Sequence, residues 1–387
     1  MNVNDLIARR GRPVICLFGW FALLVSSAGA QVLPGSLGVY ADASVEAWSN
    51  GLPILALDGK WSKGYLRRSD TQRAYASARA EAGALLSEPS VGGGAWRVGV
   101  LARADVSTRM SGQAGQVLYH YQSGTDPEQP ATYNVDTDTR FWIGKGVAFH
   151  TSTVRWGGIQ VAASWDHMTL QRLRSIQTLG EVSYDATDTY GFRGSVRDDS
   201  DKTTTPYMAA PANAGLGDAV SMTATWLSSD RNADRLSTWL PTCAKLKIED
   251  AWSRLSWEGI NGDDAVLNSN VRQRDPDGRI EYRAAINGKY TRRVLVERIP
   301  VAVQAQVEWA RPDGLWSLRV RERLGLWQHW VGWQSAGAVR YRMEVEPMAG
   351  AIAMGLEWRS LVVSVMADRL DSAARAKGAK LSVALPF

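Results

Sequence analysis

The sequence predicts an all-β protein that forms a single antiparallel up-and-down transmembrane β-barrel. Three observations predict this fold: apolar and polar residues alternate along most of the 387 residues, short turns separate the alternating segments, and the chain ends on an apolar stripe. Alternate side chains of a strand point to opposite faces, so each segment has one apolar and one polar face. At roughly 22 residues per strand and connection, we expect about 16 strands, within a range of roughly 12 to 18.

The N-terminal segment has the organisation of a secretory signal peptide. Three arginines precede the apolar run 14–25, and Ala28 and Ala30 occupy the small-residue positions before a cleavage site. We expect residues 1–30 to be removed after Ala30, which leaves residues 31–387 as the barrel. An uncleaved N-terminal anchor is the alternative.

Charge and cysteine content are compatible with an exported barrel. Cleavage would lower the formal net charge from +5 to +3, because three Arg and one Asp would be lost, and would leave Cys243 as the only cysteine. No intramolecular disulfide could then form, so a closed ring of hydrogen-bonded strands is the expected source of stability. Lys and Arg are not clustered as nucleic-acid binding usually requires, so no nucleic-acid partner is expected.

Long alternating segments fill the first two thirds of the chain. Val39, Ala41 and Val45 alternate with polar residues, and an alanine-rich alternation follows at 72–86. A helix is the alternative at 72–86, but the strict two-residue period favours a strand. Further strands are expected at 95–107, 139–150, 153–165, 181–196, 217–227 and 244–257. Long loops rich in Asp, Gly, Pro, Asn and Thr are expected at 122–137, 197–216 and 259–278.

The last third of the chain is the most regular. Strands are expected at 301–309, 316–320, 339–345, 352–358 and 361–367. Each strand is followed by a nearby return, which indicates an antiparallel meander and excludes a parallel α/β fold on connection length. Aromatic residues near the ends of the apolar stripes predict interfacial girdles. These residues are Trp48, Trp96, Trp165, Trp226, Trp309, Trp316 and Trp358. The alternative is that they fill a soluble β core.

The C-terminal stripe consists of Leu381, Val383, Leu385 and the terminal Phe387. It resembles the closing strand of bacterial outer-membrane β-barrels, in which the final aromatic residue belongs to the signal read by the barrel-assembly machinery. The resemblance implies export by way of periplasmic chaperones, insertion into outer-membrane lipid and closure of the barrel by this strand.

Side chains at the polar positions of the alternating segments are expected to line the lumen. Arginine outnumbers carboxylate among them, and the candidates for setting selectivity are Arg97, Arg103, Arg319, Arg321, Arg323, Arg340, Arg342 and Arg359. Charges in a water-filled barrel set ion selectivity, so this wall favours anionic or saccharide solutes. The alternative is a structural ladder, in which Arg340 and Arg342 face Glu357, and Glu344 faces Arg359.

No catalytic site is predicted, and neither a metal ion nor a cofactor is expected. The pair His150 and Ser152 resembles the His-x-Ser of outer-membrane phospholipase A and of lipid A deacylase. In those families Asn follows the Ser, whereas Thr153 does so here, with Asp166 and Ser164 as the candidate orienting residues. The parity of the pair also points into the lumen, away from lipid, so an enzyme is not expected.

Four functions remain open from the sequence. The leading one is an outer-membrane channel that passes small anionic or saccharide solutes. The alternatives are an exopolysaccharide export channel, a structural or adhesive surface barrel working through 197–216 and 259–278, and the lipid-modifying hydrolase.

Deletion of Phe387 tests the assembly signal. We expect the deletion to lower the amount of protein in the outer membrane, measured by membrane fractionation at low expression, while export across the inner membrane is unchanged. Equal outer-membrane levels of the deletion variant and the parent would contradict the assignment.

Overall fold

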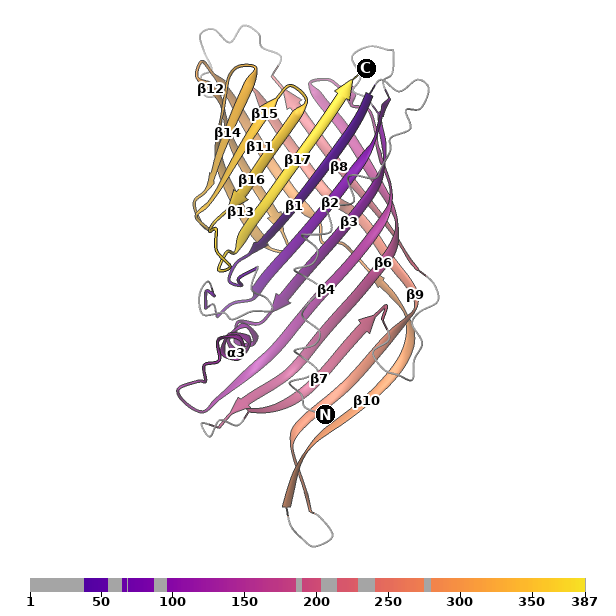
Figure 1. Ribbon diagram of the computed structural model, residues 1–387, viewed down its shortest axis with the longest axis vertical. Helices are drawn as coiled ribbons and strands as arrows, with labels where there is room; N and C mark the ends of the chain where they lie inside the picture. The colour runs from indigo at the N-terminus through magenta and orange to yellow at the C-terminus, as the bar shows by residue number, and fades with distance from the viewer. Residues whose placement is uncertain are drawn as a thin grey trace.

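The structure is a computed structural model that describes residues 38–54, 65–67, 69–86, 96–185, 190–202, 214–228, 241–274 and 280–386. The predicted signal peptide and Phe387 lie outside the described residues. The described chain contains 17 strands and one helix, α3 (Figure 1). No described helix is long and apolar enough to cross a membrane.

The strands follow one another along the chain with few irregular stretches. Their bounds are β1 (Gly38–Ser49), β2 (Gln72–Leu86), β3 (Trp96–Met110), β4 (Ala131–His150), β5 (Val154–Trp156), β6 (Ile159–Tyr184), β7 (Tyr190–Ser200), β8 (Gly215–Leu227), β9 (Cys243–Arg274), β10 (Ile280–Glu297), β11 (Ala302–Arg311), β12 (Gly314–Arg323), β13 (Leu326–Ser335), β14 (Val339–Glu346), β15 (Ala351–Trp358), β16 (Leu361–Ala367) and β17 (Ala376–Pro386).

The strands close into an antiparallel barrel of 14 strands, to which three further strands are added. The ring is closed by β17 against β1, with Val383 opposite Ala41 and Leu385 opposite Val39. Around the ring the order is β1, β2, β3, β4, β6, β8, β9, β11 and then β12 to β17 in sequence. Closure pairs the backbone groups of both terminal strands, so neither is left as an open edge.

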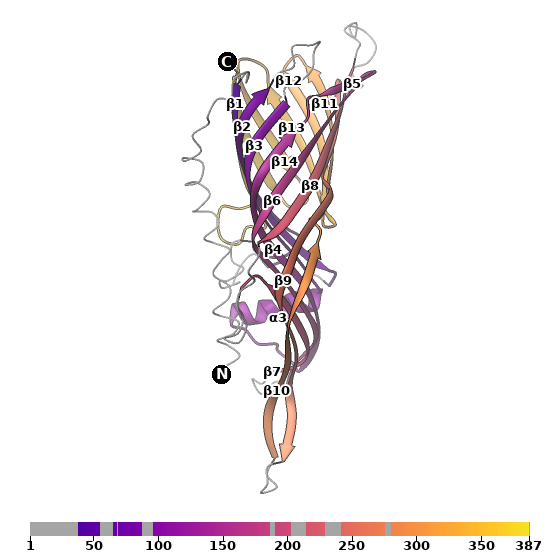
Figure 2. The ribbon, with the colours of Figure 1, turned by 90° about the vertical axis from the view of Figure 1, so that its right-hand side faces the viewer.

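Three strands of the ring continue far beyond it. β4, β6 and β9 have 20, 26 and 32 residues, whereas a tilted strand needs about 9–11 residues to cross a bilayer. Their distal halves pair with β7 and β10 in the order β4, β6, β7, β9, β10. We call this sheet the extension, and Figure 2 shows it projecting below the barrel.

Helix α3 (Gly112–Ser123) covers the outer wall where the extension begins. Ser111 caps its N-terminus by accepting a hydrogen bond from the backbone N–H of Ala114, and Gly124 ends it at a φ of 65°, which glycine adopts without strain. Ala114 packs against Ala74 and Met110 of β2 and β3. The helix was not predicted, because its apolar residues do not form a clear stripe.

The barrel wall has an apolar outer face and a polar inner face, as the predicted alternation requires. Val100, Met354 and Val365 face outward and are 57%, 57% and 56% exposed. Polar side chains such as Arg103 and Glu344 point inward and are buried. The outer wall is therefore an apolar band, as expected of a wall that faces lipid.

The predicted all-β antiparallel barrel is confirmed, and the 14 strands of its ring fall within the expected range. The strand at 72–86 is confirmed, and the helical alternative there is wrong. Two of the predicted loops are wrong: 122–137 contains the end of α3 and the start of β4, and most of 259–278 belongs to β9. Polar composition misled the prediction, because strands that leave the apolar band need no apolar face. The third loop, 197–216, overlaps β7 and β8 at its ends.

Tryptophan placement follows the prediction at four of the expected positions. Trp165, Trp226, Trp316 and Trp358 face outward and are 39–47% exposed. Trp48 is instead buried inside the barrel, so its assignment to a girdle is wrong.

Two valine substitutions test whether the outer wall faces lipid. Val365→Arg lies in the apolar band and should destabilise the folded protein in lipid vesicles by about 2 kcal/mol, because a charge on the lipid face is costly. Val266→Arg is the matched control, since Val266 is 58% exposed but lies on the extension. Denaturant titrations should show a change within about 0.5 kcal/mol for the control. Equal destabilisation by both would contradict the placement.

Candidate functional site

The lumen is crossed by a network of ion pairs. At its centre, Arg103 of β3 binds Asp250 of β9 through two hydrogen bonds of 2.7 and 2.6 Å, and its Nε lies 2.9 Å from Asp105. Arg79 of β2 binds Asp166 of β6, with its Nη2 2.9 Å from Asp166 Oδ1. Paired N–H donors on a carboxylate are the strongest geometry for such contacts.

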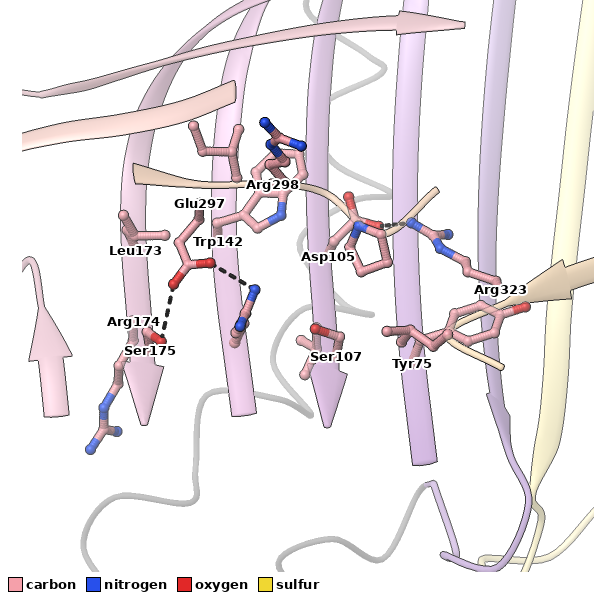
Figure 3. A pocket seen from close by; sticks show the side chains of 15 residues that line it. Tyr75, Asp105, Ser107, Trp142, Leu173, Arg174, Ser175, Glu297, Arg298 and Arg323 are labelled. Atoms are coloured by element: carbon pink, nitrogen blue, oxygen red, sulfur yellow. Dashed lines mark hydrogen bonds and ion pairs between the residues drawn. The ribbon is translucent and has the colours of Figure 1, made fainter. Parts of the chain in front are cut away.

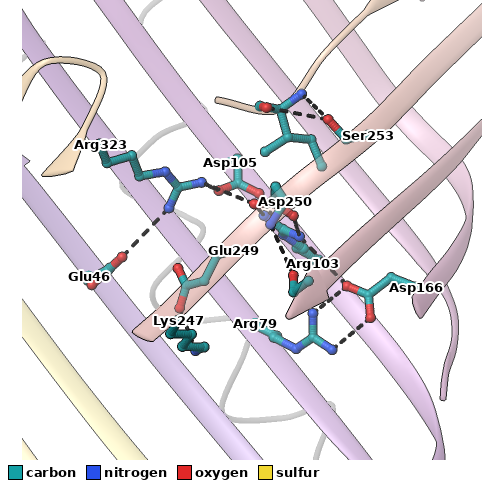
Figure 4. Close-up of polar contacts among 12 residues, drawn as sticks. Glu46, Arg79, Arg103, Asp105, Asp166, Lys247, Glu249, Asp250, Ser253 and Arg323 are labelled. Carbon is teal, nitrogen blue, oxygen red and sulfur yellow. Dashed lines mark hydrogen bonds and ion pairs between the residues drawn. The ribbon is translucent and has the colours of Figure 1, made fainter. Parts of the chain in front are cut away.

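Two arginines of β12 connect this network to the opposite wall. Arg321 binds Glu46 of β1 at 2.6 Å and Glu249 of β9 at 2.9 Å, and Arg323 binds Asp105 of β3 at 3.0 Å. Between β3 and β12 the shorter way round the ring passes β4, β6, β8, β9 and β11. These contacts therefore join opposite walls across the lumen, and Figure 4 shows Arg323 between Glu46 and Asp105. We call Glu46, Arg79, Arg103, Asp105, Asp166, Glu249, Asp250, Arg321 and Arg323 the cross-lumen network.

The inner members of the network are shielded from water. Arg103, Arg323 and Asp250 are 6%, 3% and 2% exposed. A charge held in an open aqueous lumen would keep much of its exposure. At this level the described side chains fill the interior, so the state in the structure is closed. Ions shielded in this way are tolerated only when paired.

An aromatic layer lies below the network on the β1, β2 and β13 side. Trp48 and Trp330 meet edge to face at 6.0 Å, and Gln328 donates a hydrogen bond to the Tyr75 hydroxyl at 2.9 Å. Trp48 and Leu326 also line a pocket of about 340 Å³ that includes Arg73. The aromatic layer thus separates the lumen from this pocket.

A second apolar cluster fills the barrel on the side of β3, β4, β6, β8 and β9. Its most buried members include Met168, Leu170, Leu255 and Ile260. Close by, Figure 3 shows the pocket where the barrel meets the extension, with Glu297 between Arg140 and Ser175. Glu297 Oε2 lies 2.7 Å from Arg140, yet burial raises the pKa of Glu297 above its ordinary value. Apolar and aromatic side chains therefore occupy much of the described interior below the network.

The lumen above the network is basic, and its cations Lys245 and Lys380 are exposed. Lys245 and Lys247 of β9, Lys380 of β17 and Arg342 of β14 interact electrostatically across it. Lys247 pairs with Glu249 at 2.5 Å and Arg342 with Glu344 at 2.8 Å, whereas Lys245 and Lys380 form no ion pair with a described residue. This upper lumen can attract anions.

The predicted lumen arginines are mostly placed inside the barrel, but paired. Arg97 binds Asp42, Arg319 binds Glu344 at 3.0 Å, and Arg340 binds Glu357 at 3.0 Å. Of the ladder alternative, the pairing of Arg340 with Glu357 is present, whereas Arg342 is opposite Gly355 and binds Glu344 of its own strand at 2.8 Å. The role of these arginines in selectivity stays a prediction.

One predicted lumen arginine lies elsewhere. Arg359 follows the end of β15 in a turn, with a φ of 52° and its guanidinium 5.4 Å from the Trp358 ring centroid. The turn takes Arg359 out of the strand alternation, so its assignment to the lumen wall and its pairing with Glu344 are wrong.

Of the residues of the hydrolase alternative, Ser164 is the strand partner of His150, but the contacts of the His150 side chain do not include Ser152. His150 Nε2 lies 2.6 Å from Glu81 Oε1, and Glu81 also accepts a hydrogen bond from the Tyr40 hydroxyl. Asp166 binds Arg79 and Arg103 rather than orienting His150. Within the described chain, no group of His, Cys, Asp and Glu is arranged to hold a metal ion.

Several residues of the site were missed by sequence analysis. Asp250 has a φ of 55°, close to a bulge between Val220 and Met222 of the paired strand β8. Two extra residues of β9 face Ser221 of β8 at this bulge, and Asp250 leaves the alternation there, so strict alternation could not identify Asp250. Lys245 and Lys247 do follow the alternation and could have been found from it.

Comparison with known proteins gives little. No protein-family model and no curated protein matches the chain. Three solved structures align with 92% of it: the siderophore receptor PirA from Pseudomonas aeruginosa (8% identity, 81% of that chain, TM-score 0.19), CdiB from Escherichia coli (9%, 64%, 0.19) and OccAB3 from Acinetobacter baumannii (7%, 100%, 0.18). TM-scores this low carry no argument, so the fold rests on the strand pairing described above.

A double-mutant cycle tests the energetic importance of the network. We expect Arg103→Gln and Asp250→Asn each to destabilise the protein, because each leaves a buried charge unpaired, with a coupling energy of roughly 1–3 kcal/mol. The same cycle on Arg369 and Asp371, a pair 49% and 51% exposed, should give less than about 1 kcal/mol. The measurement is denaturant unfolding in lipid vesicles. Coupling energies of similar size in both pairs would show that burial does not strengthen the network.

Proposed function

We propose that the protein is an outer-membrane channel whose lumen is held closed by the cross-lumen network. The closed ring and the exposed apolar band support a membrane-embedded barrel. The predicted signal peptide and the closing strand, which resembles those of outer-membrane barrels, support the outer membrane as its location.

The observation that carries the proposal is that ion pairs connect the opposite walls at the level of the cross-lumen network. Burying charges costs free energy, and apolar residues of the same volume are often at least as stabilising. Arg321–Glu46 and Arg323–Asp105 can separate without breaking a backbone hydrogen bond of the ring. These ion pairs are costly to bury and easily separated, so they are better suited to a gate that opens than to a permanently packed core.

The chemistry of the upper lumen supports anionic solutes. Lys245 and Lys380 face this space without an ion pair to a described residue, and the adjacent Lys247 and Arg342 add positive charge. A fixed positive potential raises the local anion concentration within about 8–10 Å at physiological salt. Small anionic solutes, including anionic saccharides, fit this wall, and an anionic exopolysaccharide would be attracted by the same cations.

The position of the extension supports an orientation of the barrel in the membrane. At the end of the barrel that holds both termini, β11 and β12 join through residues 312–313, and β15 and β16 through 359–360. Outer-membrane barrels have short periplasmic turns and longer structures outside. We infer that the end with the termini is periplasmic and that the extension lies on the outer surface.

A structural or adhesive surface barrel is the second candidate, and the extension favours it. β4, β6, β7, β9 and β10 form a sheet of their own beyond the apolar band, which a simple pore does not require. A barrel that only anchored this sheet would also have a filled lumen.

Planar-bilayer recordings separate the two candidates. We expect the parent to be closed most of the time and the double variant Glu46→Gln with Arg321→Gln to conduct more often, because two contacts across the lumen are lost. Its reversal potential under a salt gradient should show anion preference, which Lys245→Gln with Lys380→Gln in the same background should reduce.

Arg340→Gln with Glu357→Gln is the matched control, since this pair links neighbouring strands and does not cross the lumen. It should leave the open probability unchanged. A silent network variant that is folded, as shown by heat-modifiable gel migration, would favour the structural barrel. Cation preference would refute the solute class.

A further inference from the structure

A row of charged side chains crosses the outer wall where the barrel meets the extension. Val147 of β4 is opposite His167 of β6, His167 is opposite Asp218 of β8, and Asp218 is opposite Arg254 of β9. Lys145 lies two residues from Val147 on the same face of β4. Adjacent strands are about 4.8 Å apart, so Lys145 lies diagonally beside His167, and Arg254 lies two strands from His167, about 10 Å away, with Asp218 between them.

These side chains point away from the lumen. Met168, Ala219 and Leu255, which alternate with members of the row, are buried in the barrel interior. Lys145 and Arg254 are exposed, and neither forms an ion pair with a described residue. His167 Nδ1 lies 2.9 Å from Asp218 Oδ1, which also accepts a hydrogen bond from Trp165 Nε1 at 3.1 Å. Asp218 thereby orients the imidazole and leaves its Nε2 directed outward.

The row lies one membrane thickness from the periplasmic end of the wall. On β8, residues 218–226 separate Asp218 from the outward Trp226, close to the roughly 9–11 residues that a tilted strand needs to cross a bilayer. Trp165 and Trp252 are 44% and 52% exposed and adjoin the row on its apolar side. Aromatic side chains mark the interface in outer-membrane barrels. The row therefore sits at the outer interface.

We propose that Lys145, His167 and Arg254 bind the phosphate groups of an anionic lipid in the outer leaflet. Unpaired cations on a lipid-facing wall are costly unless a counter-charge of the lipid meets them. Lys and Arg are the usual partners of phosphate groups. The Lys ammonium acts as a point charge, and the planar Arg guanidinium donates two parallel hydrogen bonds. The acyl chains of the same lipid would lie on the apolar band between the exposed tryptophans. The proposal rests on the proposed membrane placement, but not on channel activity.

Lipid retention measures this site directly. The protein is placed in phosphatidylcholine nanodiscs that contain lipid A with its phosphates, and the bound lipid A is quantified by native mass spectrometry. We expect Lys145→Gln with Arg254→Gln to weaken retention at least about tenfold, because two charge-assisted contacts are lost. Lys145→Arg with Arg254→Lys should retain binding within a few-fold. Dephosphorylated lipid A should bind the parent as weakly as phosphorylated lipid A binds the Gln variant.

Lys289→Gln with Arg193→Gln is the matched control, since both residues are exposed on the extension and the change in net charge is the same. It should leave retention unchanged. Equal loss in the control and the Gln variant, or equal retention of dephosphorylated lipid A by the parent, would overturn the site. A parent that does not enter nanodiscs would overturn the membrane placement instead. Conductance plays no part in the readout, so failure of the channel proposal is recorded separately.

Discussion

The hydrogen bonds between β1 and β17 are the constraint on which the rest of the structure depends. They join the first and last strands of the ring in register over residues 38–48 and 376–386. Without them the barrel would have two open edges in an apolar environment, where unpaired backbone groups are costly. Once the ring is closed, the parity of every strand divides its side chains between the apolar band and the interior. The cross-lumen network exists because this division places charged residues of distant strands in one shielded space.

Two regions of the interior contain different kinds of side chains. Apolar and aromatic clusters occupy the end next to the extension, and charges occupy the middle. The charged region carries nearly equal numbers of cations and anions at its centre, so little net field remains there. Among the described residues, cations without an ion pair lie farther up, at Lys245 and Lys380. Counting arginines along the sequence therefore overestimates the free charge, because their partners come from strands on the opposite wall, such as Glu46 for Arg321.

Much of the fold could be predicted from local periodicity, since alternation alone placed β2 and the start of β8 within two residues. Alternation could not predict the extension, because β9 beyond residue 257 carries polar residues on both faces. It also could not predict α3, whose position depends on Ser111 and the contacts of Ala114. For the site, parity identified Arg103, Arg321 and Arg323 as interior residues. Their partners depend on the curvature of the ring and on the bulge near Asp250, neither of which is visible in one strand.

β6 and β9 belong to both the ring and the extension, and this continuity has a mechanical consequence. A strand is nearly inextensible along its axis, so a pull on the distal end of either strand is transmitted as shear along its hydrogen-bonded neighbours in the wall. Asp166 lies on β6, and Glu249 and Asp250 lie on β9, within the loaded segments. A displacement of the extension would therefore move three carboxylates relative to Arg79, Arg103 and Arg321, which stand on strands that carry no such load. The extension is thus mechanically coupled to the cross-lumen network through β6 and β9.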